Sequence, residues 1–293
     1  MPSLKEVRVR ISSVNSTQQI TKAMKMVSAA KLRRATDAIL QLRPYAEKLR
    51  EVLENLSSSI EDSSVGVFTK ERTVKNILIV AINSNKGLCG AFNTNIVRGI
   101  NRMLREEYAS VAQKGQVKVL CIGRKASDIF SKNKELYVGN RNEIYTNLNF
   151  NEAEKIAEEI MQQFAEGSYD KVLLVYNQFK NAAVQYVTTE QLLPVVPPTG
   201  PESKTQNDYI FEPTQEEIVL DLIPTSVKTQ LYKAILDSHA SEHGARMTAM
   251  SKATDNAGEL LRDLRLSYNK ARQAAITKEI LEIVGGAEAL KSA

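Results

Sequence analysis

The sequence predicts an α/β protein in which long helices at the two ends of the chain pair as an antiparallel coiled coil, with an inserted Rossmann-like domain. Three observations carry this prediction. The last seventy or so residues, after Pro224, contain no proline and consist mostly of strong helix formers. A second helical stretch occupies the first 60 residues. Between them, short apolar runs alternate with helical sequence, as in an α/β layer.

The C-terminal stretch, residues 225–290, has the apolar spacing of a coiled coil. Side chains recur at alternating intervals of four and three at Ala257, Leu261, Leu264, Tyr268, Ala271 and Ala275. A helix of this length measures roughly 100 Å at about 1.5 Å per residue. We therefore expect a partner helix, and beyond it other subunits, to cover further apolar side chains at Ile276, Ile280, Leu281, Ile283 and Val284.

The N-terminal stretch offers the partner helix. Ser3 and Glu6 form a capping box that predicts a helix beginning at Leu4. Its seam consists of Leu4, Val7, Ile11 and Val14, and then Ile39, Leu42, Ala46, Leu49, Leu53, Leu56 and Ile60. Pro44 predicts a local kink. Antiparallel pairing of the two ends predicts three regions: a helix over residues 1–60, the α/β domain over 74–213, and the second helix over 214–293.

The middle of the chain predicts strands and helices in alternation. Strands are expected at residues 76–83, 117–123, 135–139 and 171–176, with an edge strand at 184–193. Helices are expected at residues 94–112 and 125–132, and between Asn151, with Glu154, and Gly167. Thr214 and Glu217 form a second capping box, and Pro224 is expected to end that helix before the long one begins.

Charge and cysteine content narrow the class of protein. The chain has 293 residues and a net charge of +5, but residues 1–50 alone hold eleven Lys and Arg against three acids. A basic helix predicts an acidic partner surface, and the alternative is a solvated face. A nucleic-acid-binding coiled coil is a further alternative, although no aromatic residue precedes Tyr45 for base stacking. Two isolated cysteines fit a reducing compartment, and no apolar run approaches the roughly 20 residues that cross a bilayer.

Two local motifs raise enzymatic alternatives. Gly87-Leu88-Cys89-Gly90 follows the first predicted strand, where a phosphate loop could lie, but neither G-x-x-x-x-G-K-[ST] nor G-x-G-x-x-G is present. A tight turn that needs glycine is the structural alternative. His239 and His243, with Glu242, match the H-x-x-E-H zinc pattern, yet they are the only histidines in the chain. No Ser/His/Asp or Cys/His set can be assembled, and the sequence predicts no catalytic residue, metal or cofactor.

Several segments resemble one known family. They are ISSVNSTQQITKAMKMVSAAK (residues 11–31), RPYAEKLREVLENL (43–56), SNKGLCGAFN (84–93), SEHGARMTAMSKATDNAGELL (241–261) and YNKARQAAITKEILEIVGGAEAL (268–290). Together they resemble the gamma subunit of rotary, F-type ATP synthases of bacteria, and the pattern I-T-x-E-x-x-E-I-V-x-G-A is the most specific part. The resemblance covers essentially the whole chain.

This resemblance implies a function without an active site in the chain. The protein would be the central rotor shaft, turning inside a ring of alpha and beta subunits and coupling proton flow through the membrane sector to ATP synthesis. The α/β domain would form the foot of the rotor with the epsilon subunit and the c-ring. The resemblance also implies a peripheral membrane protein on the cytoplasmic face of the bacterial plasma membrane, without direct membrane insertion and without nucleic acid.

The resemblance also implies contact residues. Contacts with beta are expected at Met24, Lys86, Cys89, Arg246, Arg272, Gln273, Thr277, Glu279 and Glu282. Contacts with epsilon and the c-ring are expected at Tyr209, Phe211 and Glu212. This chain departs from the family at Asn85, where relatives typically carry Asp, and at Phe211, where they carry Tyr. A carboxylate-dependent contact at the first position and a phenol hydrogen bond at the second are therefore not expected.

Overall fold

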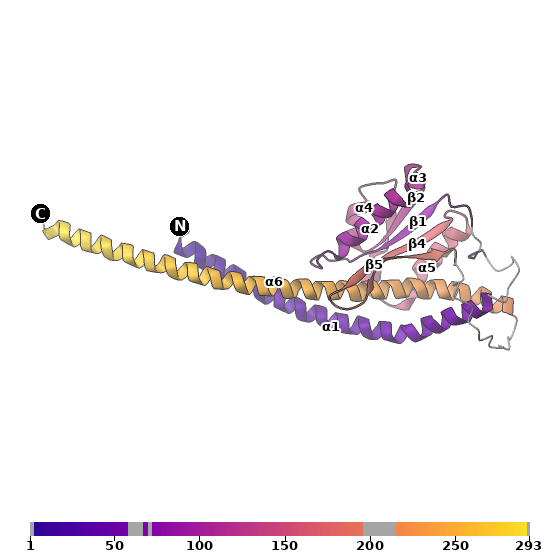
Figure 1. Ribbon diagram of the computed structural model, residues 1–293, viewed down its shortest axis with the longest axis horizontal. Coiled ribbons are helices and arrows are strands. Elements are labelled where there is room, and N and C mark those ends of the chain that lie inside the picture. Colours follow the sequence, from indigo (N-terminus) through magenta and orange to yellow (C-terminus); the bar gives the residue numbers. More distant parts are fainter. Residues whose placement is uncertain (1–2, 58–66, 70–71, 196–214, 292–293) are drawn as a thin grey trace. The chain divides into compact units, whose positions relative to one another are not determined.

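The structure is a computed structural model that describes residues 3–57, 67–69, 72–195 and 215–291 (Figure 1). It divides into two compact units, one made of Met1–Ser28 with Met247–Ala293 and the other of Ala29–Arg246. The elements in chain order are α1 Leu4–Ser57, β1 Ile77–Ile82, α2 Phe92–Glu106, α3 Ala109–Gln113, β2 Val117–Ile122, α4 Arg124–Phe130, β3 Tyr137–Asn140, the short 3-10 helix Asn142–Tyr145, α5 Phe150–Ala165, β4 Lys171–Phe179, β5 Gln185–Leu193 and α6 Gln215–Lys291.

The larger unit is built on a five-stranded sheet with strand order β3-β2-β1-β4-β5. The β1 strand pairs in parallel with both β2 and β4, while β5 runs antiparallel to β4 at the edge. All six residues of β1 are buried, as a continuous apolar run predicts for a central parallel strand. The predicted α/β, Rossmann-like fold class is confirmed.

Each face of the sheet has its own core. Ile77, Ile79 and Ala81 face the side covered by α2 and α4. Leu78, Val80 and Ile82 face α5 and the first half of α6 (Figure 1). The part of α6 around Val227 and Leu231 therefore closes the second core, and the sheet is covered on both faces.

The start of α6 corrects the sequence prediction. Pro224 was expected to end one helix before another began, but it lies inside a continuous helix that starts at Gln215. The helix continues because Ile223 and Val227, on either side of the proline, are buried in apolar clusters. The hydroxyl of Thr225 also donates to the Asp221 carbonyl at 2.9 Å, in the turn that the proline weakens. The Thr214 half of the predicted capping box lies outside the described residues.

Two other predicted boundaries are wrong. The helix expected over 94–112 is two helices, because the amides of Glu107 and Tyr108 both donate to the Met103 carbonyl and end α2. The cap of α5 is Asn149 rather than Asn151, since the Asn149 side chain accepts from the Glu152 amide at 2.9 Å. Gly167 follows that helix at φ 79°, as predicted for a residue that ends it.

In the smaller unit, α1 and α6 run antiparallel. Arg8 contacts Tyr268 and Lys25 contacts Ser251, so partner numbers on α6 fall as numbers on α1 rise. Ser3 accepts from the Glu6 amide at 3.2 Å, which confirms the predicted cap of α1. The predicted seam residues Val7, Ala257, Leu261 and Leu264 are buried. In the larger unit, Ala35 and Ile39 of α1 pack with Leu236 and Ala240 of α6 in one apolar cluster.

The end of α6 has no partner within the described residues. Every side chain from 272 to 287 is exposed, including Ile276, Leu281 and Ile283 at 49%, 66% and 67%. Figure 1 shows this end of α6 continuing past the N-terminal end of α1, within the same unit. In the described part of the chain, no helix combines the length and apolar character that crossing a membrane requires.

Candidate functional site

The loop between β1 and α2, residues 83–91, lies where function is expected in a doubly wound sheet. The chain passes from β1 to β2 and β3 on one side and then crosses to β4 on the other side of β1. The carboxyl end of β1 is therefore the point where the strand order reverses, which is the usual ligand position in such folds. Leu88 at φ 61° and Gly90 at φ 60° turn the chain sharply there.

The inner side of this loop is occupied by Arg246 of α6. Its Nη2 donates to the carbonyl oxygens of Lys86 at 2.9 Å and Gly87 at 3.2 Å, and its Nε donates to Gly87 at 3.3 Å. A phosphate-binding loop instead turns backbone N–H donors towards its ligand. Because these two carbonyls point at an arginine of the same chain, the geometry does not favour the phosphate-loop alternative.

A buried ion pair orients Arg246. Its Nη1 lies 2.7 Å from Glu242 Oε1, one helical turn earlier, and both side chains are 8% exposed. Burial raises the pKa of the Glu242 carboxyl, and the neighbouring Arg246 guanidinium opposes that rise. The Arg246 guanidinium thus contacts the Glu242 carboxylate on one side and the carbonyls of Lys86 and Gly87 on the other.

Cys89 lies inside the same loop. It is 1% exposed, and its Sγ accepts from Asn93 Nδ2 at 3.1 Å. The Ser84 hydroxyl donates to the Lys86 carbonyl at 2.7 Å, close to the same sulfur. Burial raises the pKa of the Cys89 thiol and raises that of Cys121 to about 12, so both thiols are protonated near pH 7.

The structure therefore brings together three of the predicted contact residues, Lys86, Cys89 and Arg246, but they differ in exposure. Lys86 is exposed, whereas Cys89 and Arg246 are buried at 1% and 7% exposure. The latter two side chains face the interior of this chain and hold the loop through hydrogen bonds. The loop also exposes a large apolar side chain, Leu88, at 65%, which was not among the predicted contact residues.

The paired histidines do not assemble a zinc site. The rings of His239 and His243 meet edge to face with centroids 4.5 Å apart, and Glu242 is engaged by Arg246. Across the described ranges, no three His, Cys, Asp or Glu side chains come together as a metal site would require. Burial lowers the pKa of His239 to about 4 and that of His243 to about 3, so both rings are neutral near pH 7.

The remaining described contact residues lie on the helices of the smaller unit. Met24 is half-buried on α1, between the buried Thr21 and Ser28. The others are exposed near the end of α6, on turns that α1 does not cover: Arg272, Gln273, Thr277, Glu279 and Glu282. Lys278 and Glu282 form an exposed pair at 3.5 Å, which contributes little to stability. Tyr209, Phe211 and Glu212 lie outside the described residues.

The middle of the helix pair is polar, although an apolar seam was predicted for these helices. Thr254 donates its hydroxyl hydrogen to Thr21 Oγ1 at 2.8 Å, and Lys25 Nζ donates to Ser251 Oγ at 3.0 Å. In the sequence, this polar contact is indicated by small or polar residues at the same alternating spacing of four and three as the apolar seam. Such a pairing orders two helices with less apolar burial than a leucine seam provides.

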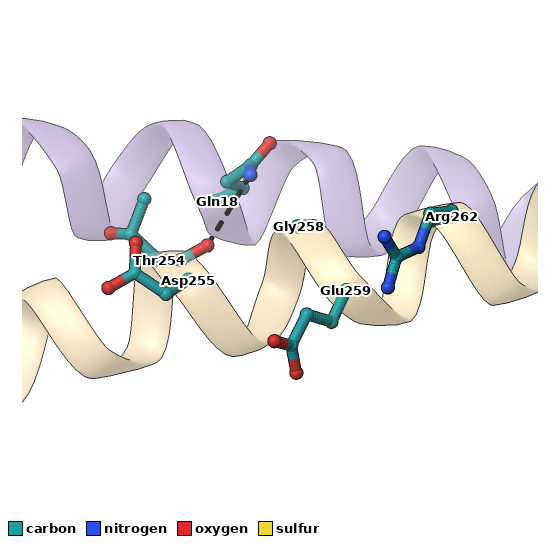
Figure 2. Close-up of a pocket in the computed structure, with 6 residues that line it drawn as sticks. All are labelled: Gln18, Thr254, Asp255, Gly258, Glu259 and Arg262. Atoms are coloured by element: carbon teal, nitrogen blue, oxygen red, sulfur yellow. Dashed lines mark hydrogen bonds between the residues drawn. The ribbon is translucent and has the colours of Figure 1, made fainter.

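A shallow groove crosses this polar region (Figure 2). Its six lining residues come from both helices: Gln18, Thr254, Asp255, Gly258, Glu259 and Arg262. Gln18 Nε2 donates weakly to the Thr254 carbonyl at 3.4 Å and lies 3.0 Å from where a Cβ on Gly258 would stand. We interpret the groove as a place of close helix approach.

The fold and the loop define a class of protein. It pairs its terminal helices, fills the inner side of its switch-point loop with its own arginine, and leaves helix surface exposed for other chains. This arrangement is typical of proteins that act by contact with other chains. Comparisons with known proteins identify the family.

The ATP synthase family model matches residues 3–290. The ATP synthase gamma chain of Christiangramia forsetii is 58% identical over 290 residues, covering 99% of both chains. That of Flavobacterium psychrophilum is 57% identical over 291 residues, covering 99% of this chain and all of the relative. This chain belongs to the ATP synthase gamma-chain family.

Solved structures agree with this assignment. A chain from the central stalk and c-ring structure of the Tetrahymena thermophila mitochondrial ATP synthase is 31% identical, with a TM-score of 0.59 over 80% of this chain and 99% of that one. A chain from the rotor of the Euglena gracilis mitochondrial enzyme has a TM-score of 0.66 over 93% of this chain and 98% of its own, and at 21% identity it shows the shared fold alone. The nucleic-acid-binding alternative receives no support from these relatives.

Proposed function

We propose that this chain is the central rotor shaft of an F-type ATP synthase. As a gamma chain it is a subunit of a complex rather than an enzyme by itself. The observation that carries the proposal is the end of α6, where residues 272–287 are all exposed and include Ile280 and Val284 at 54% and 52%. An apolar helix end of this kind needs a protein sleeve. A ring of alpha and beta subunits supplies one.

The shaft acts as an asymmetric ligand for the catalytic subunits. Different sides of α1 and α6 face different beta subunits, and each contact favours one conformation of the subunit that it touches. Rotation moves these contacts from one beta subunit to the next and shifts the three populations in sequence. Lys86, Met24 and the exposed residues near the end of α6 are the contacts with beta in this proposal, including Arg272 and Gln273.

The larger unit is the foot of the rotor. In this proposal it joins the epsilon subunit and the c-ring, through the region of Tyr209, Phe211 and Glu212, and receives the torque of proton flow. The complex would hold the chain as a peripheral protein at the cytoplasmic face of the bacterial plasma membrane. The Tetrahymena structure, which combines central stalk and c-ring, supports the c-ring part of this proposal.

Purification from native membranes tests the proposal. A tagged chain should bring down alpha and beta chains in about threefold excess, and the complex should pump protons when given ATP. Replacing Arg272 and Gln273 by Ala should weaken assembly or ATP synthesis, because it removes their proposed hydrogen bonds to a beta subunit. One charge-assisted hydrogen bond contributes about 1.5–3 kcal/mol. Arg265→Ala, at an exposed position on the same helix, is the control. Recovery of the chain alone, or with nucleic acid, would contradict the proposal.

A further inference from the structure

The loop of residues 83–91 holds a bulky residue in an uncommon conformation. Leu88 has φ 61°, in the left-handed region that a side chain with a Cβ adopts at an energetic cost. It is 65% exposed, so no burial of its own side chain compensates for that cost. A conformation of this kind persists only where its surroundings impose it, and such positions concentrate at functional sites.

Contacts on both sides of Leu88 impose it. Before it, the carbonyls of Lys86 and Gly87 accept from Arg246, and Ser84 donates to the Lys86 carbonyl. After it, the buried Cys89 accepts from Asn93 on α2. Leu88 is thus a projecting apolar side chain between two anchored segments, and the anchor on its N-terminal side comes from α6.

Only a guanidinium can make the α6 anchor. Arg246 uses Nη1 for Glu242 and directs Nη2 and Nε to two successive carbonyls, so its planar group is engaged on both sides. The ion pair with Glu242 prevents the guanidinium from turning away. A lysine keeps the charge but presents a single point, and cannot reach the carboxylate and both carbonyls together.

We propose that Arg246 is a positioning residue, which ties the loop of residues 83–91 to α6 so that Leu88 and Lys86 meet a partner at a defined position. This inference rests on the proposed function, in which α6 is part of the rotating shaft. The anchor makes the loop move as one body with the helix. Without it, the loop would be joined to α6 only through the packing of the helix on the sheet, and the tip of the loop could shift relative to the helix.

The charges around Leu88 define the partner's chemistry. Lys86 and Arg124 are exposed, and Lys125 Cε lies 3.9 Å from where a Cβ on Gly87 would stand. Asp128 pairs with Arg124 at 3.9 Å and with Lys125 at 3.5 Å, so these four side chains leave a net positive charge. Asn85 Oδ1 accepts from the Arg124 amide, which keeps that basic residue beside the loop. The surface that fits this face is an apolar recess with carboxylates at its rim. In the proposed complex, that surface belongs to a beta subunit.

The two cysteines of the chain provide a direct test of the anchor. In the purified full-length chain, Arg246→Lys should increase the labelling rate of Cys89 by N-ethylmaleimide about tenfold or more, the scale of a lost charge-assisted hydrogen bond. Labelling of Cys121, buried within β2, should not change. The exposed Arg265→Lys is the matched control and should alter neither rate. An unchanged Cys89 rate, or an equal rise at both cysteines, would overturn the proposal.

The assembled complex tests what the anchor does. Arg246→Lys should leave assembly and the ATPase rate near normal but lower the protons pumped per ATP, whereas a merely stabilising residue would reduce all three together. Leu88→Ala should lower the same ratio, and the double variant should lower it no further than the stronger single variant. A normal ratio in either single variant, or additive losses, would contradict the role. If the wild-type chain fails to assemble with alpha and beta, both the proposed function and the proposed contact of Leu88 with a beta subunit are contradicted. The labelling rates of the two cysteines still test separately whether Arg246 holds the loop.

Discussion

The side-chain amide of Asn85 joins two turns at the carboxyl edge of the sheet, donating from Nδ2 to the Asn142 carbonyl at 3.0 Å. Its Oδ1 accepts from the Arg124 amide at 2.9 Å. One group therefore acts as donor and acceptor at once, which an ionised carboxylate cannot do. This internal bridge accounts for an asparagine at position 85.

Asn85→Asp should destabilise the chain at neutral pH. The carboxylate loses the donor to Asn142 and places a negative charge beside that carbonyl, at a cost of about 1–3 kcal/mol. The deficit should shrink below about pH 4, where a protonated Asp can donate again. Urea unfolding of the full chain at pH 7.5 and pH 4 measures this. Equal stability of variant and wild type at pH 7.5 would show that the bridge contributes nothing.

Gly123→Ala should be among the most damaging single changes in the larger unit. Gly123 has φ 118°, and a Cβ there would stand 2.2 Å from the Asn83 carbonyl oxygen. Backbone at the end of β1 cannot move away without disturbing the sheet, so a loss of about 3 kcal/mol or more is expected. Gly115→Ala is the control, because Gly115 also has positive φ, 71°, but nothing within 4 Å. Thermal unfolding should separate the two variants clearly.

Asp237→Asn should stabilise the chain at neutral and alkaline pH. Asp237 is 3% exposed, and burial raises its pKa to about 6, opposed by Lys233 and Arg43 and assisted by Glu190. Because the folded state holds this proton more tightly than the unfolded state, wild-type stability falls as pH rises from about 4 to 6. Removing the charge should recover about 1–3 kcal/mol above pH 6 and nothing below about pH 4.

Unfolding free energies measured from pH 4 to pH 8 check the Asp237 prediction. The exposed Asp255→Asn, on the same helix, is the matched control variant. A gain for Asp237→Asn that is the same at every pH would mean that the benefit comes from packing and not from the carboxyl charge.

Met24→Lys should leave the complex assembled and able to hydrolyse ATP, but should couple hydrolysis poorly to proton transport. Met24 is half-buried beside the polar Thr21–Thr254 contact, so a lysine there can direct its charge outwards. An added attraction to an acidic beta surface would favour one angle of the shaft and raise the barrier to leaving it. A partly desolvated ion pair can reach several kcal/mol, against about 0.2–1 when exposed.

Assembly, ATPase rate and ATP-driven pumping in membrane vesicles test the Met24 prediction. Met26→Lys, at a position 62% exposed, is the neighbouring control. Normal pumping per ATP in Met24→Lys would contradict the coupling idea. Failure to assemble would instead favour a packing role for Met24 against α6.

By itself, the sequence determined the fold class, the strands and the antiparallel pairing, because these follow from local propensity and apolar spacing. The buried run of β1 and the seam of Ala257, Leu261 and Leu264 are examples. Only the tertiary structure decided that α6 continues through Pro224. The apolar burial of Ile223 and Val227 stabilises the helix by more than the one backbone hydrogen bond that the proline removes. It also decided the roles at the loop, because Arg246 lies 159 residues from Gly87 in the chain and no local pattern records their contact. Cys89 and Arg246 are buried behind the exposed Leu88 and support its loop, and burial depends on the packing of the whole unit.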